Sequence, residues 1–192
     1  DETVYLTIFD GLHFENNQYE VAHQITVSGT HENRYDVTVL INGLPIVQVE
    51  LKRRGVDFRQ AFNQVVRYKS ESMCGLFRFV QLFVISNGGE TRYFANGDGD
   101  LNANFMFYWT DRENNWLNDL DAFSASLFTK ERLHSLIAKY TIFDSAKERL
   151  MIMRPYQIYA VEAIIKKAQD HPDKNGFVWH TTGSGKTVTS FK

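Results

Sequence analysis

The chain has 192 residues, which is enough for one ordinary domain and part of a second. Hydrophobic residues make up 43% and charged residues 23% of the sequence, a balance typical of a globular protein and unlike that of a disordered chain. The formal net charge of −2 argues against a polybasic nucleic-acid binder, and the single cysteine, Cys74, excludes an internal disulfide and a cysteine-rich zinc site.

The sequence shows no membrane-span candidate and no signal peptide. Cys74 is expected to be a buried thiol in a reducing compartment, which indicates a cytoplasmic protein without a membrane partner. The chain starts without Met and stops just after a phosphate-binding motif, so we expect it to be a piece of a longer protein.

Residues 19–52 are expected to form three strands, over 19–27, 35–41 and 46–52. A polar turn separates the first two strands. The dipeptide Asn42-Gly43 lies between two apolar, β-branched runs and is the strongest short-range hairpin signal. An ordinary β-meander would give the same pattern, so this region alone indicates only a sheet.

The period then changes. Apolar residues at helical spacing predict a helix from about Asp57 to Ser70. Residues 78–86 are an apolar strand candidate, and 91–96 its hairpin partner across Asn87-Gly88-Gly89. After a loop over 97–104, a strand is expected at 105–110, and residues 115–150 look mostly helical, with helices at 119–128, 130–140 and 145–152. This order predicts an α/β fold with helices packed around a sheet.

A new unit is expected near Arg154. Pro155 opens a helix over 154–169, a short strand is expected at 177–180, and a glycine-rich loop follows. Strand, glycine loop and helix start are the entry to a nucleotide-binding domain. The predicted division is therefore 1–148 for the first domain and 149–192 for the start of the second.

The first candidate site consists of Asp36, Glu50 and Lys52. Period-2 geometry places Glu50 and Lys52 on one face of their strand, and the Asn-Gly hairpin brings Asp36 beside Glu50. Two carboxylates supply the hard oxygen ligands that Mg²⁺ prefers, and the backbone carbonyl of Leu51 is a further candidate ligand. Lys52 would then lie beside water bound to the metal, to orient or deprotonate it or to neutralise charge on phosphorus.

The alternative for these residues is a surface Glu–Lys pair with an unrelated Asp. Local charge favours a phosphate-binding site, because the segment from Glu50 to Lys69 is rich in basic residues: Lys52, Arg53, Arg54, Arg59, Arg67 and Lys69. Glu20, on the preceding strand, is a weaker candidate and is expected to be a solvated residue at a strand start.

The spacing Asp-x13-Glu-x-Lys across a hairpin, followed by a helix, resembles the PD-(D/E)xK nuclease family, with Tyr35 in the place of the family's proline. The resemblance implies a mixed sheet flanked by helices and Mg²⁺-dependent hydrolysis of DNA phosphodiesters. The segment Gln64-Val65-Val66-Arg67-Tyr68 resembles the QxxxY motif of RecB-like nucleases and of the restriction (motor) subunits of type I restriction–modification enzymes. Gln64 and Tyr68, one turn apart on one helix face, would support the site or hold the DNA backbone. Without the resemblance they are two amphipathic residues on a half-exposed stripe.

The second candidate site is the loop Thr182-Gly183-Ser184-Gly185-Lys186-Thr187. Its glycines let backbone N–H groups approach phosphate, Lys186 would reach the β- and γ-phosphates, and the Thr187 hydroxyl would bind Mg²⁺. Position 180, where the strict pattern has glycine, is histidine. The loop resembles motif I of type I restriction subunits; the alternative is a plain glycine-rich turn.

Gln157 lies about thirty residues before Lys186 and resembles the adenine-reading Q motif of superfamily 2 helicases, which favours ATP. The alternative is a polar residue near a helix N-terminus. No acidic Walker-B box follows the loop within the sequence, so this polypeptide alone is not expected to hydrolyse ATP or to translocate.

The resemblance therefore implies a type I site-specific deoxyribonuclease that cuts double-stranded DNA under the control of an ATP-driven motor of RecA-like, superfamily 2 type. Its expected partners are double-stranded DNA and separate methyltransferase and specificity subunits. Two alternatives stay open: a RecB-like repair nuclease–helicase, and a non-catalytic module that couples DNA to the motor.

Overall fold

The computed structural model describes residues 8–97, 99–146 and 149–192. Its centre is a five-stranded sheet in the order β1-β2-β3-β4-β5, in which β3 and β4 are parallel and the other pairs antiparallel. The strands are β1 Tyr19–Ser28, β2 Glu32–Ile41, β3 Leu44–Leu51, β4 Leu82–Ser86 and β5 Thr91–Ala95. The prediction of a mixed sheet flanked by helices is confirmed.

The hairpin between β2 and β3 forms at Asn42-Gly43 as expected. Both residues have positive φ, 51° and 77°, which is the backbone that a tight two-residue hairpin turn requires. Strand β2 is longer than expected and begins at Glu32, because β1 pairs with it up to the Glu32–Ser28 pair. Asp36 therefore lies within β2 and does not start it.

The helix α1 (Phe58–Glu71) connects the parallel strands β3 and β4, as a parallel pair requires. Asp57 caps it by accepting a hydrogen bond from the Arg59 backbone N–H. Its buried face packs on one side of the sheet, against residues of β4 and β5, in a cluster that contains Ala61, Phe62, Val65, Phe83, Ile85 and Phe94. The prediction of this helix is confirmed.

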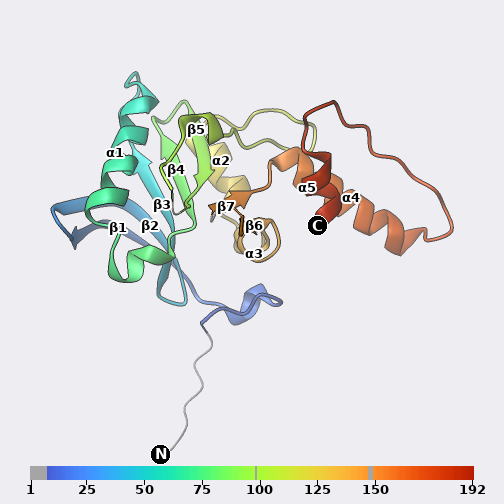
Figure 1. Ribbon diagram of the computed structural model, residues 1–192, viewed down its shortest axis with the longest axis horizontal. Helices are drawn as coiled ribbons and strands as arrows, with labels where there is room; N and C mark the ends of the chain where they lie inside the picture. Colours follow the sequence, from blue (N-terminus) through green and yellow to red (C-terminus); the bar gives the residue numbers. More distant parts are fainter. Residues whose placement is uncertain (1–7, 98, 147–148) are drawn as a thin grey trace, which may run out of the picture.

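The other side of the sheet is covered by α2 (Leu120–Leu127) and α3 (Lys130–Ala138). They share the larger core with the opposite faces of β3 and β4. Members of this core include Val47, Val49, Val84, Trp109, Phe123 and Leu133. Figure 1 shows α1 at one end of the molecule and α4 and α5 at the other. None of the helices in the described ranges is long and apolar enough to cross a membrane.

Four expectations about secondary structure are wrong. Residues 78–81 precede β4 and belong in part to a 3₁₀ turn, η2 (Gly75–Phe79). Phe105 ends another 3₁₀ turn, η3 (Ala103–Phe105), and residues 106–110 make only isolated bridges. The chain crosses the sheet edge there, because Met106 packs in the α1-side core and Trp109 in the opposite one. Asp98, in the expected loop, lies outside the described residues.

The helix expected at 145–152 is instead the end of a β-hairpin, in which β6 (Thr141–Asp144) pairs with β7 (Arg149–Ile152). Tertiary pairing overrides the local helix propensity, and Lys147 and Glu148 lie outside the described residues. The predicted boundary between residues 148 and 149 thus falls between two paired strands. Residues 177–180 are not a strand, since no described strand lies beside them to pair with, and Phe177 and Trp179 are each 88% exposed.

The helix expected from Arg154 is confirmed as α4 (Pro155–Asp170), with Pro155 in its first turn. Its buried residues Ile158 and Val161 belong to the same core as the sheet, so the start of α4 is packed onto the first domain. A short helix, α5 (Lys186–Phe191), ends the described chain, and a 3₁₀ turn, η1 (Phe14–Asn16), precedes β1.

Cys74 is exposed and not buried as expected. It lies in the connection between α1 and η2, where the thiol donates a hydrogen bond to the carbonyl oxygen of Ser28, at 3.6 Å. Cys74 belongs to neither core cluster, although the neighbouring Met73 packs against the α1-side cluster.

Candidate active site

Asp36 and Glu50 come together where β2 and β3 separate. The strand register pairs Val37 with Val49, so the next positions outward are Asp36 and Glu50. Beyond that pair the Asp36 side chain takes the place of a backbone acceptor from β2, because its Oδ2 accepts a hydrogen bond from the Leu51 N–H at 2.8 Å. The sequence prediction that the hairpin would bring these residues together is confirmed.

Lys52 lies on the same face as Glu50, as period-2 geometry predicts. Its Nζ donates to Glu50 Oε1 at 2.7 Å, and its side chain is 21% exposed whereas that of Glu50 is fully buried. The alternative reading of a surface Glu–Lys pair is therefore wrong for Glu50.

The second carboxylate oxygen of Glu50, Oε2, is buried and has no hydrogen-bond partner. Burial raises the pKa of Glu50 to about 7; the hydrogen bond from Lys52 opposes that change, while the neighbouring charge of Asp36 adds to it. A buried carboxylate that lacks a partner for one oxygen is costly to the fold, and such groups concentrate at functional sites.

This donor set fits a small divalent cation. A cation between the two carboxylates would supply the missing partner of Glu50 Oε2 and neutralise the repulsion between Glu50 and Asp36. The described residues contain no group of three or more His, Cys, Asp and Glu side chains that could hold a metal. Mg²⁺ binds through few protein ligands and keeps several waters. Two carboxylates and a backbone carbonyl, such as that of Leu51, match this coordination.

Gln64 and Tyr68 on α1 continue the site as a chain of hydrogen bonds. Lys52 Nζ donates to Gln64 Oε1 at 2.5 Å, and Gln64 Nε2 donates to the Tyr68 hydroxyl. The Tyr68 hydroxyl in turn donates to the Arg34 carbonyl oxygen on β2 at 3.0 Å. Gln64 thus holds the Lys52 ammonium, and Tyr68 connects Gln64 to strand β2.

Tyr35, in the position where the PD-(D/E)xK family has proline, had no role predicted from the sequence. Tyr35 is fully buried, its ring lies 4.8 Å from those of Tyr68 and Phe77, and its hydroxyl bonds to Ser72 Oγ at 2.8 Å. It joins β2 to the end of α1 and so fixes the strand that carries Asp36. The signal in the sequence was an aromatic residue at the start of an expected strand.

Glu20 lies away from these residues. It pairs with Leu40 in the register of β1 and β2, four positions along β2 from Asp36, and it is exposed. Its carboxylate accepts a hydrogen bond from Gln18. The expectation of a solvated residue is confirmed.

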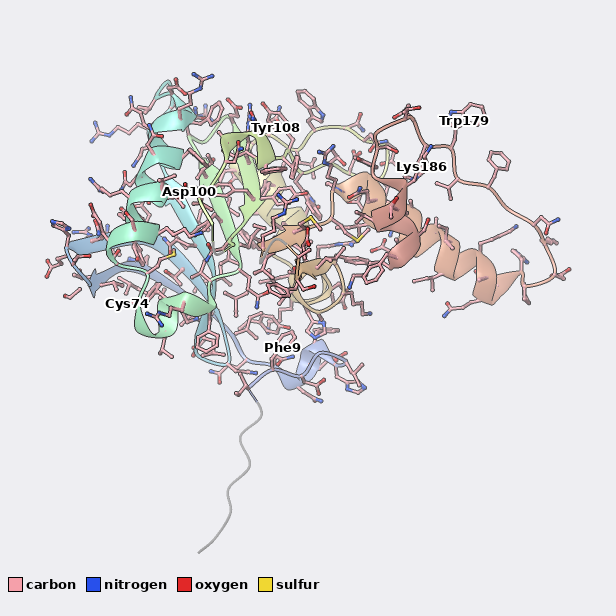
Figure 2. The ribbon with its side chains drawn as sticks, in the orientation of Figure 1. Phe9, Cys74, Asp100, Tyr108, Trp179 and Lys186 are labelled. Carbon is pink, nitrogen blue, oxygen red and sulfur yellow. The ribbon has the colours of Figure 1, made fainter. Side chains whose placement is uncertain are left out.

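The loop of the second candidate site lies against α4. Gly183 and Gly185 have positive φ, 78° and 79°, which side chains other than glycine rarely adopt. The Ser184 carbonyl oxygen between them accepts hydrogen bonds from the Tyr156 hydroxyl at 2.7 Å and from Gln157 Nε2 at 3.0 Å. Lys186 and Thr187, at the start of α5, are exposed (Figure 2).

Gln157 is almost fully buried, and both ends of its amide are engaged. Besides Ser184 it contacts the Arg154 backbone, whose N–H donates to Gln157 Oε1 at 2.9 Å. It also lines a cavity of about 340 Å³ between the loop and strands β5 and β7. Its expected role as an adenine reader stays a prediction, and the structure adds that it ties the loop to α4; the Tyr156 contact was not anticipated from the sequence.

Comparison with known proteins matches two separate parts of the chain to different families. Residues 1–101 match the family model described as type I restriction enzyme R protein N terminus, and residues 156–192 match a SWI2/SNF2 ATPase model. The chain is 52% identical over its whole length to the endonuclease subunit of a type I restriction enzyme of Staphylococcus aureus, strain MSSA476, and covers 21% of that relative.

Two further relatives have the same kind of name. The chain is 47% identical over 86% of its length to the endonuclease subunit of the type I restriction enzyme EcoprrI of Escherichia coli, of which it covers 54%. It is 28% identical over 98% of its length to a putative type I endonuclease subunit of Methanocaldococcus jannaschii, of which it covers 21%. The chain thus spans about a fifth of the length of the staphylococcal and archaeal relatives.

Proposed function

Because the chain belongs to the family of the type I restriction enzyme R protein N terminus, we propose that Asp36, Glu50 and Lys52 are the DNA-cutting site of a type I restriction endonuclease. The observation that carries the proposal is the buried Glu50 carboxylate, whose Oε2 lacks a partner beside Asp36 and Lys52. The substrate is double-stranded DNA, and the reaction is hydrolysis of its phosphodiester bonds.

In this proposal Asp36, Glu50 and the Leu51 carbonyl hold Mg²⁺. When bound, Mg²⁺ polarises the phosphate and makes water a better nucleophile. Lys52 keeps its ammonium at a fixed place, because Glu50 and Gln64 both accept hydrogen bonds from it, and from there it stabilises the negative charge that develops on the phosphate. The exposed guanidinium groups of Arg53, Arg54 and Arg59, which directly follow the site in the chain, bind neighbouring phosphates.

The topology supports a nuclease of the PD-(D/E)xK type. A central strand, β3, carries the Glu-x-Lys pair, its antiparallel neighbour β2 carries the Asp, and α1 returns across the same face. The relatives named above are restriction subunits, which favours this assignment over a RecB-like repair enzyme. The buried Glu50 Oε2 without a hydrogen-bond partner disfavours a non-catalytic coupling module. Such a group destabilises the fold, and a module without catalysis would gain nothing from it.

We assign the second site to the entrance of an ATP-driven DNA motor in the full-length protein. The match to SWI2/SNF2 ATPases over residues 156–192 supports this assignment. The residues proposed to bind Mg²⁺-ATP are Gln157, Gly183, Ser184, Gly185, Lys186 and Thr187. The proposed partners of the whole protein are the methyltransferase and specificity subunits of a type I restriction–modification complex.

The test of the cutting site is plasmid cleavage by the full-length protein in its assembled complex, with magnesium and ATP. Asp36→Ala and Lys52→Ala are each expected to lower cleavage by a factor on the order of 10²–10³ while ATP hydrolysis continues. Glu20→Ala is the matched control, because it removes an exposed carboxylate from the same sheet. Cleavage at the wild-type rate in both site variants would refute the assignment.

Gln64→Ala is expected to lower cleavage about 10–100-fold, because loss of a residue that orients a site residue has effects of this size. The variant frees the Lys52 ammonium from one of its two anchors without removing it from the site. Its effect should fall on the cleavage rate constant and should be restored in part by Gln64→Glu, which keeps an acceptor for Lys52. Asn63→Ala, an exposed amide on the same helix, is the control. Loss of ATP hydrolysis along with cleavage would instead mean a folding role for Gln64.

A further inference from the structure

Four flat side chains form a continuous stack beside the proposed cutting site. The Trp116 indole lies parallel to the Tyr108 ring, with centroids 4.5 Å apart and 11° between the planes. The Cζ atom of the Arg92 guanidinium lies 4.4 Å from the centroid of the Tyr108 ring and 4.2 Å from that of the Phe58 ring, at the start of α1. We refer to Phe58, Arg92, Tyr108 and Trp116 as the aromatic stack.

The aromatic stack begins on the same face of the sheet as Glu50. Arg92 pairs with Ile85 in the register of β4 and β5, and Ile85 pairs with Glu50 in that of β3 and β4. Cross-strand partners point to the same face, and two strand spacings place the Cα atoms of Arg92 and Glu50 roughly 10 Å apart. Figure 2 shows Tyr108 on the upper side of the view, where the first turn of α1 also lies.

Trp116 is exposed although the residues around it are held in place. Its side chain is 63% exposed, and it bridges to Thr110. Between these two positions Asp111 closes a turn by accepting from the backbone of Glu113 and Asn115. At the base of the stack the Glu90 carboxylate accepts from both Arg92 and Tyr108. The indole is thus stacked on Tyr108 through one face, and most of the residue stays open to solvent.

The loop that leads to the Phe58 end of the aromatic stack is basic, whereas the turn that carries Trp116 contains Asp111 and Glu113. The basic loop favours a nucleic acid over an apolar partner. Phe58 is followed directly by Arg59, and the loop that leads from Lys52 to α1 exposes Arg53 and Arg54. Arg54 reaches Asp119, at 4.0 Å, which places this basic loop on the side of the sheet end from which α2 starts. Phosphates that bind these guanidinium groups would bring the bases of the same strand toward the open face of Trp116.

We propose that the open face of Trp116 binds an unpaired nucleobase of the DNA next to the cut, as the next ring of the aromatic stack. This rests on the proposed function. A flat ring that is already stacked on one side accepts a second flat ring on the other, and every base has such a face. In a duplex both faces of each internal base are covered, so the contact selects DNA that is locally unpaired beside the cutting site.

The test measures binding of the full-length chain to two labelled DNAs in the presence of EDTA: a fully paired duplex, and the same duplex with a short unpaired stretch at its centre. Wild type is expected to bind the second more tightly. Trp116→Ala is expected to weaken that binding about tenfold, within the range for loss of one base–aromatic stack, with little change on the paired duplex. Trp116→Tyr should retain most of the preference. Phe143→Ala removes a ring that is 59% exposed on β6 and is the matched control.

Three results would overturn the inference: no effect of Trp116→Ala, an equal loss on both DNAs, or normal DNA binding with loss of assembly with the methyltransferase and specificity subunits. The last would make Trp116 a protein contact. The retained preference of Trp116→Tyr guards against misfolding as an explanation. The outcomes stay separate from the proposed function, because that proposal is judged by cleavage in Asp36→Ala and this one by binding without cutting.

Discussion

Replacing Glu50 with glutamine is expected to lower DNA cleavage by a factor on the order of 10³ without unfolding the protein. Glutamine has nearly the same shape and its carbonyl oxygen still accepts the hydrogen bond from Lys52. It lacks the negative charge that is proposed to hold a divalent cation beside Asp36. Cleavage of a plasmid by the full-length assembly over a range of magnesium concentrations measures the effect, and recovery at high magnesium would show weakened binding of the ion.

The same change should stabilise the region around β3 when magnesium is absent. The pKa of Glu50 is raised from 4.5 to about 7, so the folded state holds a proton that the unfolded state has released between these values. The free energy of unfolding of the wild type therefore falls as the pH rises through this window, by up to about 3 kcal/mol. Below pH 4.5 the loss is absent, and above pH 7 it is complete.

Hydrogen exchange of the β3 amides in the full-length chain, with EDTA, measures this local stability. Wild type should show opening that becomes easier from pH 4.5 to 7, after correction for the intrinsic exchange rate. Glu50→Gln should remove that dependence, and Glu20→Gln, which alters an exposed carboxylate, should leave it unchanged. A wild type that is equally protected across the window would contradict the burial argument.

Lys186→Ala in the full-length protein is expected to lower ATP hydrolysis by a factor on the order of 10²–10³, because the lysine is proposed to place its charge against the β- and γ-phosphates. The change should not alter the loop, since its backbone is held by Gly183, Gly185 and the contacts from Tyr156 and Gln157 to Ser184. Lys186 is exposed and makes no contact in the core. Lys192→Ala, an exposed lysine just beyond α5, is the control.

The two sites should differ in how a defect in one affects the other. Cleavage by the assembly is expected to fall in Lys186→Ala, because cutting is proposed to depend on the motor. ATP hydrolysis is expected to continue in Asp36→Ala. Wild-type cleavage by Lys186→Ala in an assay that requires ATP would contradict the proposed coupling, and wild-type ATP hydrolysis by this variant would refute the assignment of the loop.

Local signals explain the parts of the fold that the sequence predicted correctly. Asn42-Gly43 specifies a tight hairpin through positive φ, and the apolar spacing after Asp57 specifies α1 and the face it buries. The spacing of Glu50 and Lys52 specifies one face of a strand. Each of these follows from a few neighbouring residues.

Long-range contacts explain the errors. Residues 145–152 have helix-forming composition, but the chain there pairs with β6. Residues 105–110 have strand-forming composition, but the chain crosses from one core to the other. Residues 177–180 resemble a strand, and a strand forms only beside a partner.

For the candidate site, the sequence by itself determined which charged groups are present, and through the hairpin it determined that Asp36 and Glu50 are neighbours. Only the tertiary structure decided that Glu50 is buried with an unpartnered oxygen, that Gln64 and Tyr68 hold Lys52, and that Trp116 completes a stack beside the site. The reason is physical: turn geometry and strand period act over a few residues, whereas burial, hydrogen-bond chains and ring stacking depend on which distant segments the fold brings together.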